Sequence, residues 1–300
     1  MTGRSARQSV QLTNPDRVLY QEQGTTKRDL ANYYMNVAGF ILPYIEDRLL
    51  TLVRCPEGRH RECFFQKHAK IGMPDSIRAV DVREKNARVK YVAVDDVLGL
   101  VGLVQMGVLE VHIWGSRASN YEQPDQLVFD LDPDPELPYE RVVQGALRVR
   151  DELETFGLRS FVKTTGGKGL HVVMPVRPSL EWSETKLFCK AIAERIAHAE
   201  PEHYVTTVTK SRRKNKIFVD YLRNSRGATA IAPFSTRALP GAPVAAPLSW
   251  RELERSRQMP RFDILSVCTR LRRSTSDPWQ DFFRVRQSVT LAMRRAVRAA

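Results

Sequence analysis

Two aspartates at the end of an apolar segment are the residues of this chain best suited to metal chemistry. Leu127-Val128-Phe129 leads directly into Asp130-Leu131-Asp132, and prolines follow at positions 133 and 135. A short β-branched and aromatic run stopped by proline predicts a buried strand. Side chains alternate across a strand, so Asp130 and Asp132 point to the same side, where two carboxylates could hold Mg²⁺ or Mn²⁺. A solvated acidic turn is the alternative, because Asp-Pro pairs commonly form turns.

A third aspartate repeats this pattern. Asp220 ends the apolar run Ile217-Phe218-Val219, and the segment from His203 to Arg226 carries seven Lys or Arg residues around it. Three carboxylates presented in this way could hold two cations, which clamp the attacking and leaving oxygens of a phosphoryl displacement. The alternative for Asp220 is a structural ion pair with Arg223 or Arg226.

A glycine-rich segment supplies groups that bind phosphate. Between Lys163 and His171 the chain carries three glycines, two lysines, two threonines and a histidine. Glycines let backbone N–H groups close around an anion, and Lys168 adds a positive charge. The spacing is not that of a P-loop. A tight hairpin is the alternative, but the flanking Lys and His favour phosphate binding.

Further basic and aromatic residues could contact nucleic acid. Arg213 and Arg237 could hold a triphosphate or a template, although single arginines are more often solvated surface charges. Phe64 and Phe65 lie beside Lys67, and an exposed aromatic ring stacked on a base contributes ~1–3 kcal/mol. Adjacent residues on a strand point to opposite faces, so at least one of the two rings is expected in the core.

The composition is that of a basic globular protein. The 300 residues are enough for one large domain or two lobes, and 47 Lys and Arg against 34 Asp and Glu give a net charge of +13. This excess predicts a polyanionic partner, most simply nucleic acid. With no apolar run approaching the roughly 18 residues of a membrane span and no secretory signal, no membrane association and a cytoplasmic location are expected. The four cysteines form no C-x-x-C pair, which predicts free thiols in a reducing compartment.

The elements that must position these residues alternate between helices and strands, which indicates an α/β or α+β fold. Thr26 or its neighbour Thr25 is a plausible N-cap for an amphipathic helix through Ile45, and His112 lies on the polar side of a half-buried strand. The sequence predicts helices over 25–45, 95–106, 139–156, 183–199 and 278–300, and strands over 49–53, 109–114, 127–132, 216–222 and, around a turn, 159–176. Residues 1–10 are expected to be a disordered basic lead-in to one domain over 11–300, with sub-lobes of about 11–120 and 121–300.

Several of these motifs occur together in one known family. The chain closely resembles the polymerase domain of bacterial ligase D, which belongs to the archaeo-eukaryotic primase superfamily and serves non-homologous end joining. The resemblance covers nearly the whole chain. It rests on motifs that occur in the family's order: Thr13-Asn14-Pro15-Asp16-Arg17, Phe64-Phe65-Gln66-Lys67-His68, Leu127-Val128-Phe129-Asp130-Leu131-Asp132-Pro133, Lys163-Thr164-Thr165-Gly166-Gly167-Lys168-Gly169-Leu170-His171, Lys216-Ile217-Phe218-Val219-Asp220-Tyr221 and Ala232-Pro233-Phe234-Ser235-Thr236-Arg237.

The resemblance implies a two-lobed catalytic core with an RRM-like sheet and template-directed nucleotidyl transfer that favours Mn²⁺ and ribonucleotides. It implies a DNA substrate with a gap or double-strand break, NTP or dNTP as second substrate, and Ku and a DNA ligase as partners at the nucleoid. Metal binding is implied for Asp130, Asp132 and Asp220. Contacts to the nucleotide are implied for His112, Thr165, Lys168, His171, Arg213 and Arg237. Contacts to DNA are implied for Asn14, Arg17 and Lys27, which would hold a 5′-phosphate, and for Phe64 and Phe65, which would stack on the template.

Two residues depart from the family's pattern. Thr165 stands where Ser is usual, which keeps the hydroxyl, and Arg17 stands where Lys is common, which keeps the charge but alters phosphate geometry. The chain contains no K-x-D-G ligase motif, so it is either a stand-alone polymerase or a domain of a larger ligase. Two other functions use the same residues: a DNA-end-binding module without catalysis, and a metal-dependent nuclease.

Overall fold

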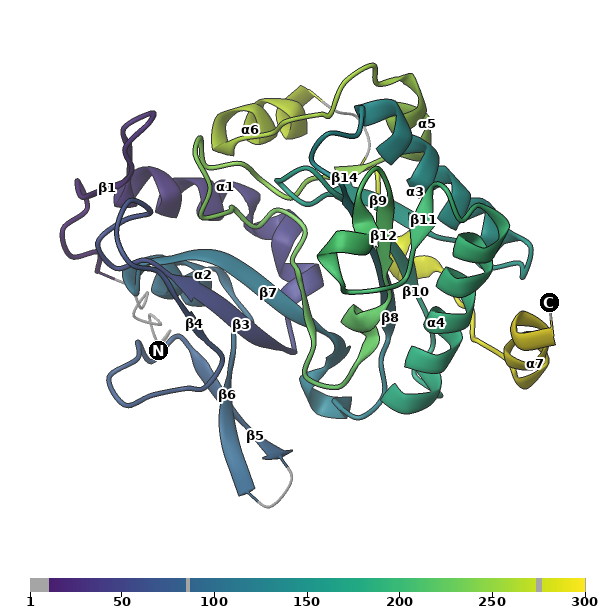
Figure 1. Ribbon diagram of the computed structural model, residues 1–300. Coiled ribbons are helices and arrows are strands. Elements are labelled where there is room, and N and C mark those ends of the chain that lie inside the picture. Colours follow the sequence, from purple (N-terminus) through teal and green to yellow (C-terminus); the bar gives the residue numbers. More distant parts are fainter. Residues whose placement is uncertain (1–10, 85–86, 274–276, 300) are drawn as a thin grey trace.

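The computed structural model describes residues 11–84, 87–273 and 277–299, which build two sheets with helices packed on them (Figure 1). The predicted disordered lead-in over residues 1–10 lies outside the described residues. The first sheet has the strand order β13-β7-β3-β6-β5, with β4 paired to β3, and the second has the order β11-β12-β8-β10-β9-β14. A separate two-stranded ribbon pairs β1 with β2 near the N-terminus.

The first sheet contains β3 (Arg48–Arg54), β4 (Phe64–Gln66), β5 (Arg78–Glu84), β6 (Ala87–Ala93), β7 (Val108–Arg117) and β13 (Thr229–Ile231). The second contains β8 (Gln126–Pro133), β9 (Phe161–Thr164), β10 (Leu170–Pro175), β11 (Tyr204–Val205), β12 (Ile217–Asp220) and β14 (Pro247–Leu248). The ribbon is β1 (Val18–Tyr20) with β2 (Thr25–Thr26). The α-helices are α1 (Lys27–Ile45), α2 (Val97–Gln105), α3 (Tyr139–Glu154), α4 (Trp182–Ala199), α5 (Trp250–Arg255), α6 (Ile264–Arg273) and α7 (Leu291–Ala299). Four short 3₁₀ helices are η1 (Ala118–Asn120), η2 (Lys210–Arg213), η3 (Leu222–Asn224) and η4 (Phe282–Arg284).

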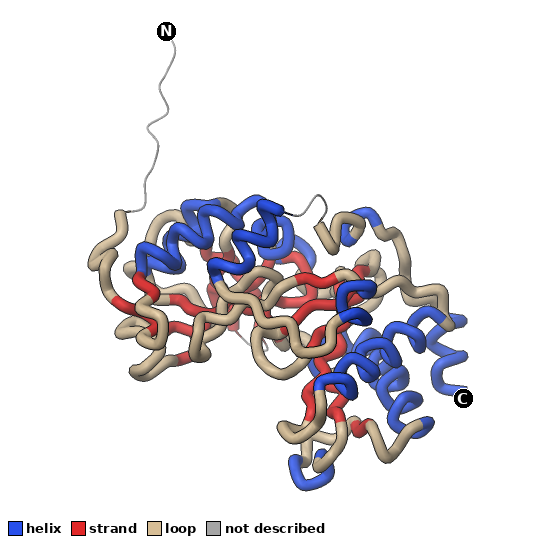
Figure 2. The backbone as a smooth tube through the Cα atoms, turned by 90° about the horizontal axis from the view of Figure 1, so that it is seen from above, coloured by secondary structure: helices blue, strands red, loops and turns tan. Residues whose placement is uncertain are grey.

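Two large hydrophobic cores hold the sheets and helices together, and the first also contains Val128, Phe161 and Val173 of the second sheet. Helices α1 and α2 pack with β3 and β7 in one core, and α3 and α4 pack with β8, β10 and β12 in the other. Seen from above, the strands of both sheets run through the middle of the molecule, and the C-terminus lies at the helix-rich end (Figure 2). There, α7 packs beside α4 and Arg294 pairs with Glu184. Among the described residues, none of the helices is both long and apolar enough to cross a membrane.

The second sheet has two different faces. Leu127 and Phe129 of β8 belong to the helix-covered core, whereas Val128 belongs to the core of the first sheet. Successive side chains of a strand point to opposite faces, so Asp130 and Asp132 share the face of Val128. The predicted carboxylates therefore lie on the face turned toward the first sheet.

Helix α1 starts where the sequence predicts. Thr26 is the N-cap, and its side chain and that of Asp29 form a reciprocal capping box. This arrangement satisfies two backbone N–H groups that the first helical turn leaves free. The β5–β6 hairpin and helix α6 were not predicted, although both carry a regular charged and apolar pattern.

The prediction of one helix over 278–300 is wrong for its first half. Helix α7 begins only at Leu291, and before it Trp279 and Phe282 are buried with ring centroids 4.9 Å apart. The Trp279 indole donates a hydrogen bond to the Val162 carbonyl at 2.9 Å. Burial of these two rings against the core outweighs the helix propensity of the segment, because packing rather than propensity supplies most helical stability.

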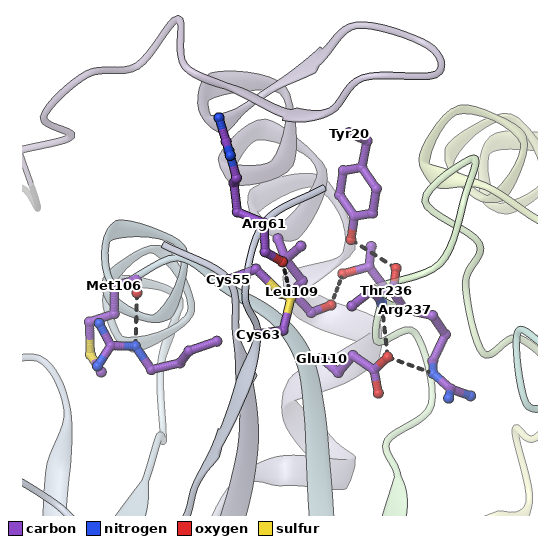
Figure 3. Close-up of a disulfide and its surroundings, with 11 residues drawn as sticks. Tyr20, Cys55, Arg61, Cys63, Met106, Leu109, Glu110, Thr236 and Arg237 are labelled. Carbon is purple, nitrogen blue, oxygen red and sulfur yellow. Dashed lines mark hydrogen bonds and ion pairs between the residues drawn. A yellow bond between two sulfur atoms is a disulfide. The ribbon is translucent and has the colours of Figure 1, made fainter. Parts of the chain in front are cut away.

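The prediction of free thiols is wrong for two of the four cysteines. Cys55 and Cys63 form a disulfide that closes the loop between β3 and β4 (Figure 3). Cys189 and Cys268 are free, as predicted. The two cysteines stand at opposite ends of the loop that connects the antiparallel strands β3 and β4. They are therefore 8 residues apart and lack C-x-x-C spacing.

Candidate active site

Four ionisable side chains from four adjacent strands form a row on the second sheet. Asp220 of β12 lies opposite Asp130 of β8, Asp130 lies opposite His171 of β10, and His171 lies opposite Lys163 of β9. Directly opposed residues in antiparallel strands put their side chains on the same face, with Cβ atoms about 4.5–5.5 Å apart. Asp132 lies two residues further along β8 and shares that face. Strand register thus joins the three separate motifs of the sequence.

Two arginines neutralise the carboxylates. Arg223 of η3 contacts Asp130 Oδ2 at 3.1 Å and Asp220 Oδ2 at 3.4 Å, so one guanidinium bridges both acids. Arg213 of η2 donates to Asp132 Oδ2 at 3.1 Å. The ion pair between Asp220 and Arg223 considered above therefore exists, whereas Arg226 pairs with Glu122 instead.

The three carboxylates differ in their affinity for protons. Burial alone would raise the pKa of Asp130, but contact with His171 and the charges of Arg223 and Lys163 hold it well below its usual range. Burial and the nearby charge of Asp130 raise the pKa values of Asp132 and Asp220. Asp130 is thus the firmly ionised member of the set, and a further cation near it would favour ionisation of the other two.

The other two residues of the row, His171 and Lys163, lie where burial disfavours their positively charged forms. Burial and the neighbouring Lys163 lower the pKa of His171 to about 4, and its Nε2 lies 3.3 Å from Asp130 Oδ1. Burial likewise lowers the pKa of Lys163 to about 7, and its Nζ is buried with no hydrogen-bond partner among the described residues. His171 is therefore neutral at neutral pH and can donate Nε2–H to the Asp130 carboxylate.

A cavity of about 290 Å³ opens over the row. It is lined by eight of the nine residues that the sequence associates with metal or nucleotide, namely His112, Asp130, Asp132, Thr165, Lys168, His171, Asp220 and Arg237. The ninth, Arg213, adjoins it through Asp132. Arg223 also lines the cavity. From the sequence it is expected only as an ion-pair partner of Asp220, because it stands outside the glycine-rich motif.

The glycine-rich turn is shaped by close backbone approaches. The Thr165 hydroxyl donates to the Gly169 carbonyl at 3.1 Å and accepts from the Gly167 amide at 3.3 Å. A Cβ at position 169 would lie 2.5 Å from the Leu131 carbonyl oxygen, and Gly166 has φ +75°. Glycine is required at 169 because any side chain would push the turn away from β8.

Arg237 connects this turn to the first sheet. Its Nη1 donates to the Thr165 carbonyl at 2.6 Å, and its Nε lies 3.0 Å from Glu110 Oε1 on β7. Glu110 also contacts His112 Nε2 at 2.7 Å. Glu110 was not among the predicted site residues; its signal is its place two residues before His112 on the same alternating strand.

The donor set has the chemistry of a divalent-cation site. Its carboxylate oxygens are the ligands that Mg²⁺ and Mn²⁺ prefer, and Arg223 already holds one positive charge between Asp130 and Asp220. Across the part of the chain that the structure describes, however, no group of three or more His, Cys, Asp or Glu side chains converges as a metal site. Asp132 contacts Arg213 instead and is 62% exposed.

A second constellation lies at the start of α1. Lys27 donates from Nζ to the Thr13 carbonyl at 3.0 Å and to Gln105 Oε1 at 2.8 Å. Burial and the neighbouring Arg17 lower the pKa of Lys27. Arg17 donates to the Pro56 carbonyl at 2.8 Å in the disulfide-closed loop.

Backbone contacts complete this cluster. Asn14 has φ +48° and accepts the amide of Arg17 at 3.1 Å, and the Arg17 carbonyl in turn accepts the amide of Lys27 at 2.9 Å. The structure therefore brings the three predicted phosphate contacts together. The structure adds Gln105 to this cluster. Gln105 lies 78 residues after Lys27, so no local sequence pattern connects the two.

The expectation that Phe64 or Phe65 lies in the core is wrong. Phe64 is 40% and Phe65 76% exposed, while Gln66 is buried. Strand β4 is only three residues long, and among the described residues it pairs with no strand other than β3, which leaves both rings uncovered. Arg54 lies over the Phe64 ring, 5.3 Å from its centroid. Two adjacent exposed rings beside basic residues are suited to stacking on bases.

Comparison with known proteins decides the family. The sequence model described as "LigD, primase-polymerase domain" matches residues 26–279. The chain belongs to the LigD primase-polymerase domain family. It is 37% identical over 294 residues to the multifunctional non-homologous end joining protein LigD of Pseudomonas aeruginosa, covering 97% of this chain and 35% of that protein. It is 31% identical over 284 residues to the bifunctional LigD of Bacillus subtilis, covering 94% of this chain and 46% of that protein.

The LigD family also accounts for the architecture. The polymerase domain from Mycobacterium tuberculosis ligase D, solved in complex with DNA, superposes with a TM-score of 0.85 at 33% identity. The match covers 91% of this chain and 98% of that one. The mixed α/β fold of a primase-type polymerase domain is therefore confirmed. The chain spans between about a third and a half of the LigD proteins it matches.

Proposed function

We propose that this chain is a template-directed, metal-dependent nucleotidyltransferase that fills gaps and extends DNA ends in double-strand-break repair by non-homologous end joining. One observation carries the proposal: a single cavity joins the row of Asp130, Asp220 and His171 to the glycine-rich turn. A row of carboxylates suits metal ions, and a glycine-rich basic turn suits a triphosphate. Membership of the LigD family and the names of its relatives supply the process.

In this proposal Asp130, Asp132 and Asp220 hold Mn²⁺ or Mg²⁺. Bound cations would lower the pKa of the attacking hydroxyl and neutralise the leaving pyrophosphate. The protein groups then do the positioning. Lys168, Arg213 and Arg237 provide positive charge for the triphosphate, and Arg223 joins them. The side chains of His112, Thr165 and His171 orient the nucleotide by hydrogen bonds.

The cluster on the first sheet would hold the DNA end. Asn14, Arg17 and Lys27 are proposed to bind a 5′-phosphate, and Phe64 and Phe65 to stack on the template beside it. Ribonucleotides are the favoured substrates in this proposal. Because the relatives are named as non-homologous end joining proteins and the solved structure as a domain of ligase D, a DNA ligase and an end-binding Ku protein are the proposed partners.

A gap-filling assay tests the proposal. The substrate is a gapped duplex with a 5′-phosphate, supplied with labelled NTP or dNTP in Mn²⁺ or in Mg²⁺. Strand lengthening that the double variant Asp130→Ala, Asp132→Ala abolishes is expected. Binding without lengthening would indicate an end-binding module, and strand shortening would indicate a nuclease; either result refutes the proposal.

A further inference from the structure

Glu110 is a buried carboxylate that contacts two groups of the cavity at once. It is 6% exposed, and its Oε2 lies 2.7 Å from His112 Nε2. Its Oε1 accepts the Ala238 amide at 2.8 Å and lies 3.0 Å from Arg237 Nε, as Figure 3 shows for Arg237. The Arg237 contact is an ion pair, because the Nε–H is not directed at the oxygen.

Glu110 itself does not line the cavity, but its two side-chain partners, His112 and Arg237, do. Through Arg237 its influence reaches the second sheet, because Arg237 Nη1 donates to the Thr165 carbonyl at 2.6 Å. The carboxylate therefore links β7 of the first sheet to the turn on the second. Any effect of Glu110 on a bound ligand must pass through His112 or Arg237.

The protonation states of the pair follow from their surroundings. Although burial opposes it, contacts with His112, Arg237 and the Ala238 amide bring the pKa of Glu110 to about 2. Burial lowers the pKa of His112 below its ordinary value. A neutral imidazole beside an ionised carboxylate must donate its Nε2–H, which leaves Nδ1 as an acceptor. No hydrogen-bond partner of Nδ1 occurs within the described ranges.

We propose that Glu110 is a positioning residue of the nucleotide site, which holds His112 as the Nε2–H tautomer so that Nδ1 accepts a hydrogen bond from the nucleotide, and which fixes the Arg237 guanidinium for the triphosphate. The identity of the ligand rests on the proposed function. The tautomer rests on the contact with Glu110 and on the burial of His112.

Glu110→Gln tests the tautomer because the amide has only one acceptor. Its oxygen must take the place of Oε1, where it accepts the Ala238 amide. Its NH₂ group then faces His112 Nε2, which can accept that hydrogen bond only by losing its own proton. The proton moves to Nδ1, and the ring nitrogen left for the nucleotide becomes a donor.

Glu152 offers a matched control. It is 4% exposed and also contacts two basic side chains, Arg148 at 2.9 Å and Arg195 at 2.6 Å. It lies on α3 and does not line the cavity. Glu152→Gln therefore removes an equally buried charge without touching His112 or Arg237, and it measures the effect of destabilisation alone.

The experiment combines ¹⁵N NMR of labelled histidine with steady-state gap filling, calorimetric NTP binding and thermal unfolding. Wild type is expected to show Nε2–H at His112, and Glu110→Gln to show Nδ1–H. The KM for NTP is expected to rise about 10- to 100-fold in Glu110→Gln, with a smaller change in kcat and unchanged affinity for gapped DNA. Glu152→Gln is expected to change only the melting temperature.

An Nδ1–H tautomer in wild type overturns the proposal even if Glu110→Gln fails to fold. So does a KM for NTP within twofold of wild type, or an equal rise in Glu152→Gln. If wild type adds no nucleotide, the proposed function fails, while the tautomer and the calorimetric NTP affinity still decide the role of Glu110.

Discussion

The two candidate binding regions of the molecule hold their charges in different ways. On the second sheet, His171 and Lys163 are buried beside the half-buried Asp130, and strand register fixes their order. At the start of α1, Lys27 donates to the Thr13 carbonyl and to Gln105 Oε1, and Arg17 donates to the Pro56 carbonyl and pairs with the exposed Glu57 at 3.0 Å. The first region holds buried charges against one another, whereas the second holds Lys27 by neutral oxygens and Arg17 by a carbonyl and a surface ion pair.

This difference predicts different sensitivities. A charge buried among other charges cannot be removed without shifting its neighbours, because electrostatic interactions are strong in a low dielectric. A charge held by neutral oxygens, as Lys27 is, can be removed without leaving a buried opposite charge unpaired. Substitutions in the row should therefore have large and coupled effects, and substitutions in the α1 cluster should have small effects confined to one contact.

The largest effect is expected for Asp130→Asn. This substitution removes the most firmly ionised carboxylate, so nucleotide addition should fall about 10³-fold or more while binding to gapped DNA persists. Single-turnover extension and DNA affinity are the measurements. Asp134→Asn is the matched control, because Asp134 is half-buried, does not line the cavity and accepts the amides of Glu136 and Asn215. Equal losses in both variants would contradict an active-site role for the row.

Lys163→Met should stabilise the protein by about 2–4 kcal/mol at pH 7, since its pKa falls from 10.5 to about 7 on folding. The unfolded chain binds this proton below pH 10.5 and the folded chain only below 7. Wild-type stability is therefore lost as pH falls from 10.5 to 7 and is constant below. Urea unfolding at several pH values should show that the free energy of unfolding of the variant exceeds that of wild type by a margin that grows as pH falls from 10.5 to 7. Lys190→Met on the exposed face of α4 should show no such trend.

Cys63→Ser should lower the free energy of unfolding by about 2–3 kcal/mol, because the disulfide closes a short loop in the unfolded chain. The same loss should appear when wild type is reduced, as measured by urea unfolding. Cys268→Ser removes a free, half-buried thiol and serves as the control. Wild type that is equally stable with and without reductant would refute a stabilising disulfide.

The smallest effect is expected for Lys27→Ala. Affinity for a 5′-phosphorylated gap should fall about tenfold, and affinity for a 5′-hydroxyl gap should hardly change, because one charge-assisted contact is lost. Titration of both substrates at fixed salt measures this. Arg28→Ala is the control, since Arg28 is exposed and pairs with Asp16. Equal weakening of binding to both substrates would show that Lys27 does not contact the 5′-phosphate.

Sequence patterns were sufficient where the chemistry is contiguous. Alternation placed Asp130 and Asp132 on one face, and the capping signal at Thr26 located the start of α1. The patterns failed where burial decided the outcome. Phe64 and Phe65 are both exposed because β4 has only one neighbour, and the segment around Trp279 is held by the core and not by helix propensity.

The residue types of the site and their local order can be predicted from the chain, because strand period and turn geometry are short-range properties. Which of these residues contact one another depends on the tertiary structure. Arg223 reaches Asp130 across 93 residues, and Glu110 meets the Ala238 amide across 128. Long-range contacts of this kind depend on how two sheets pack, and a local pattern carries no information about the neighbour that burial will provide.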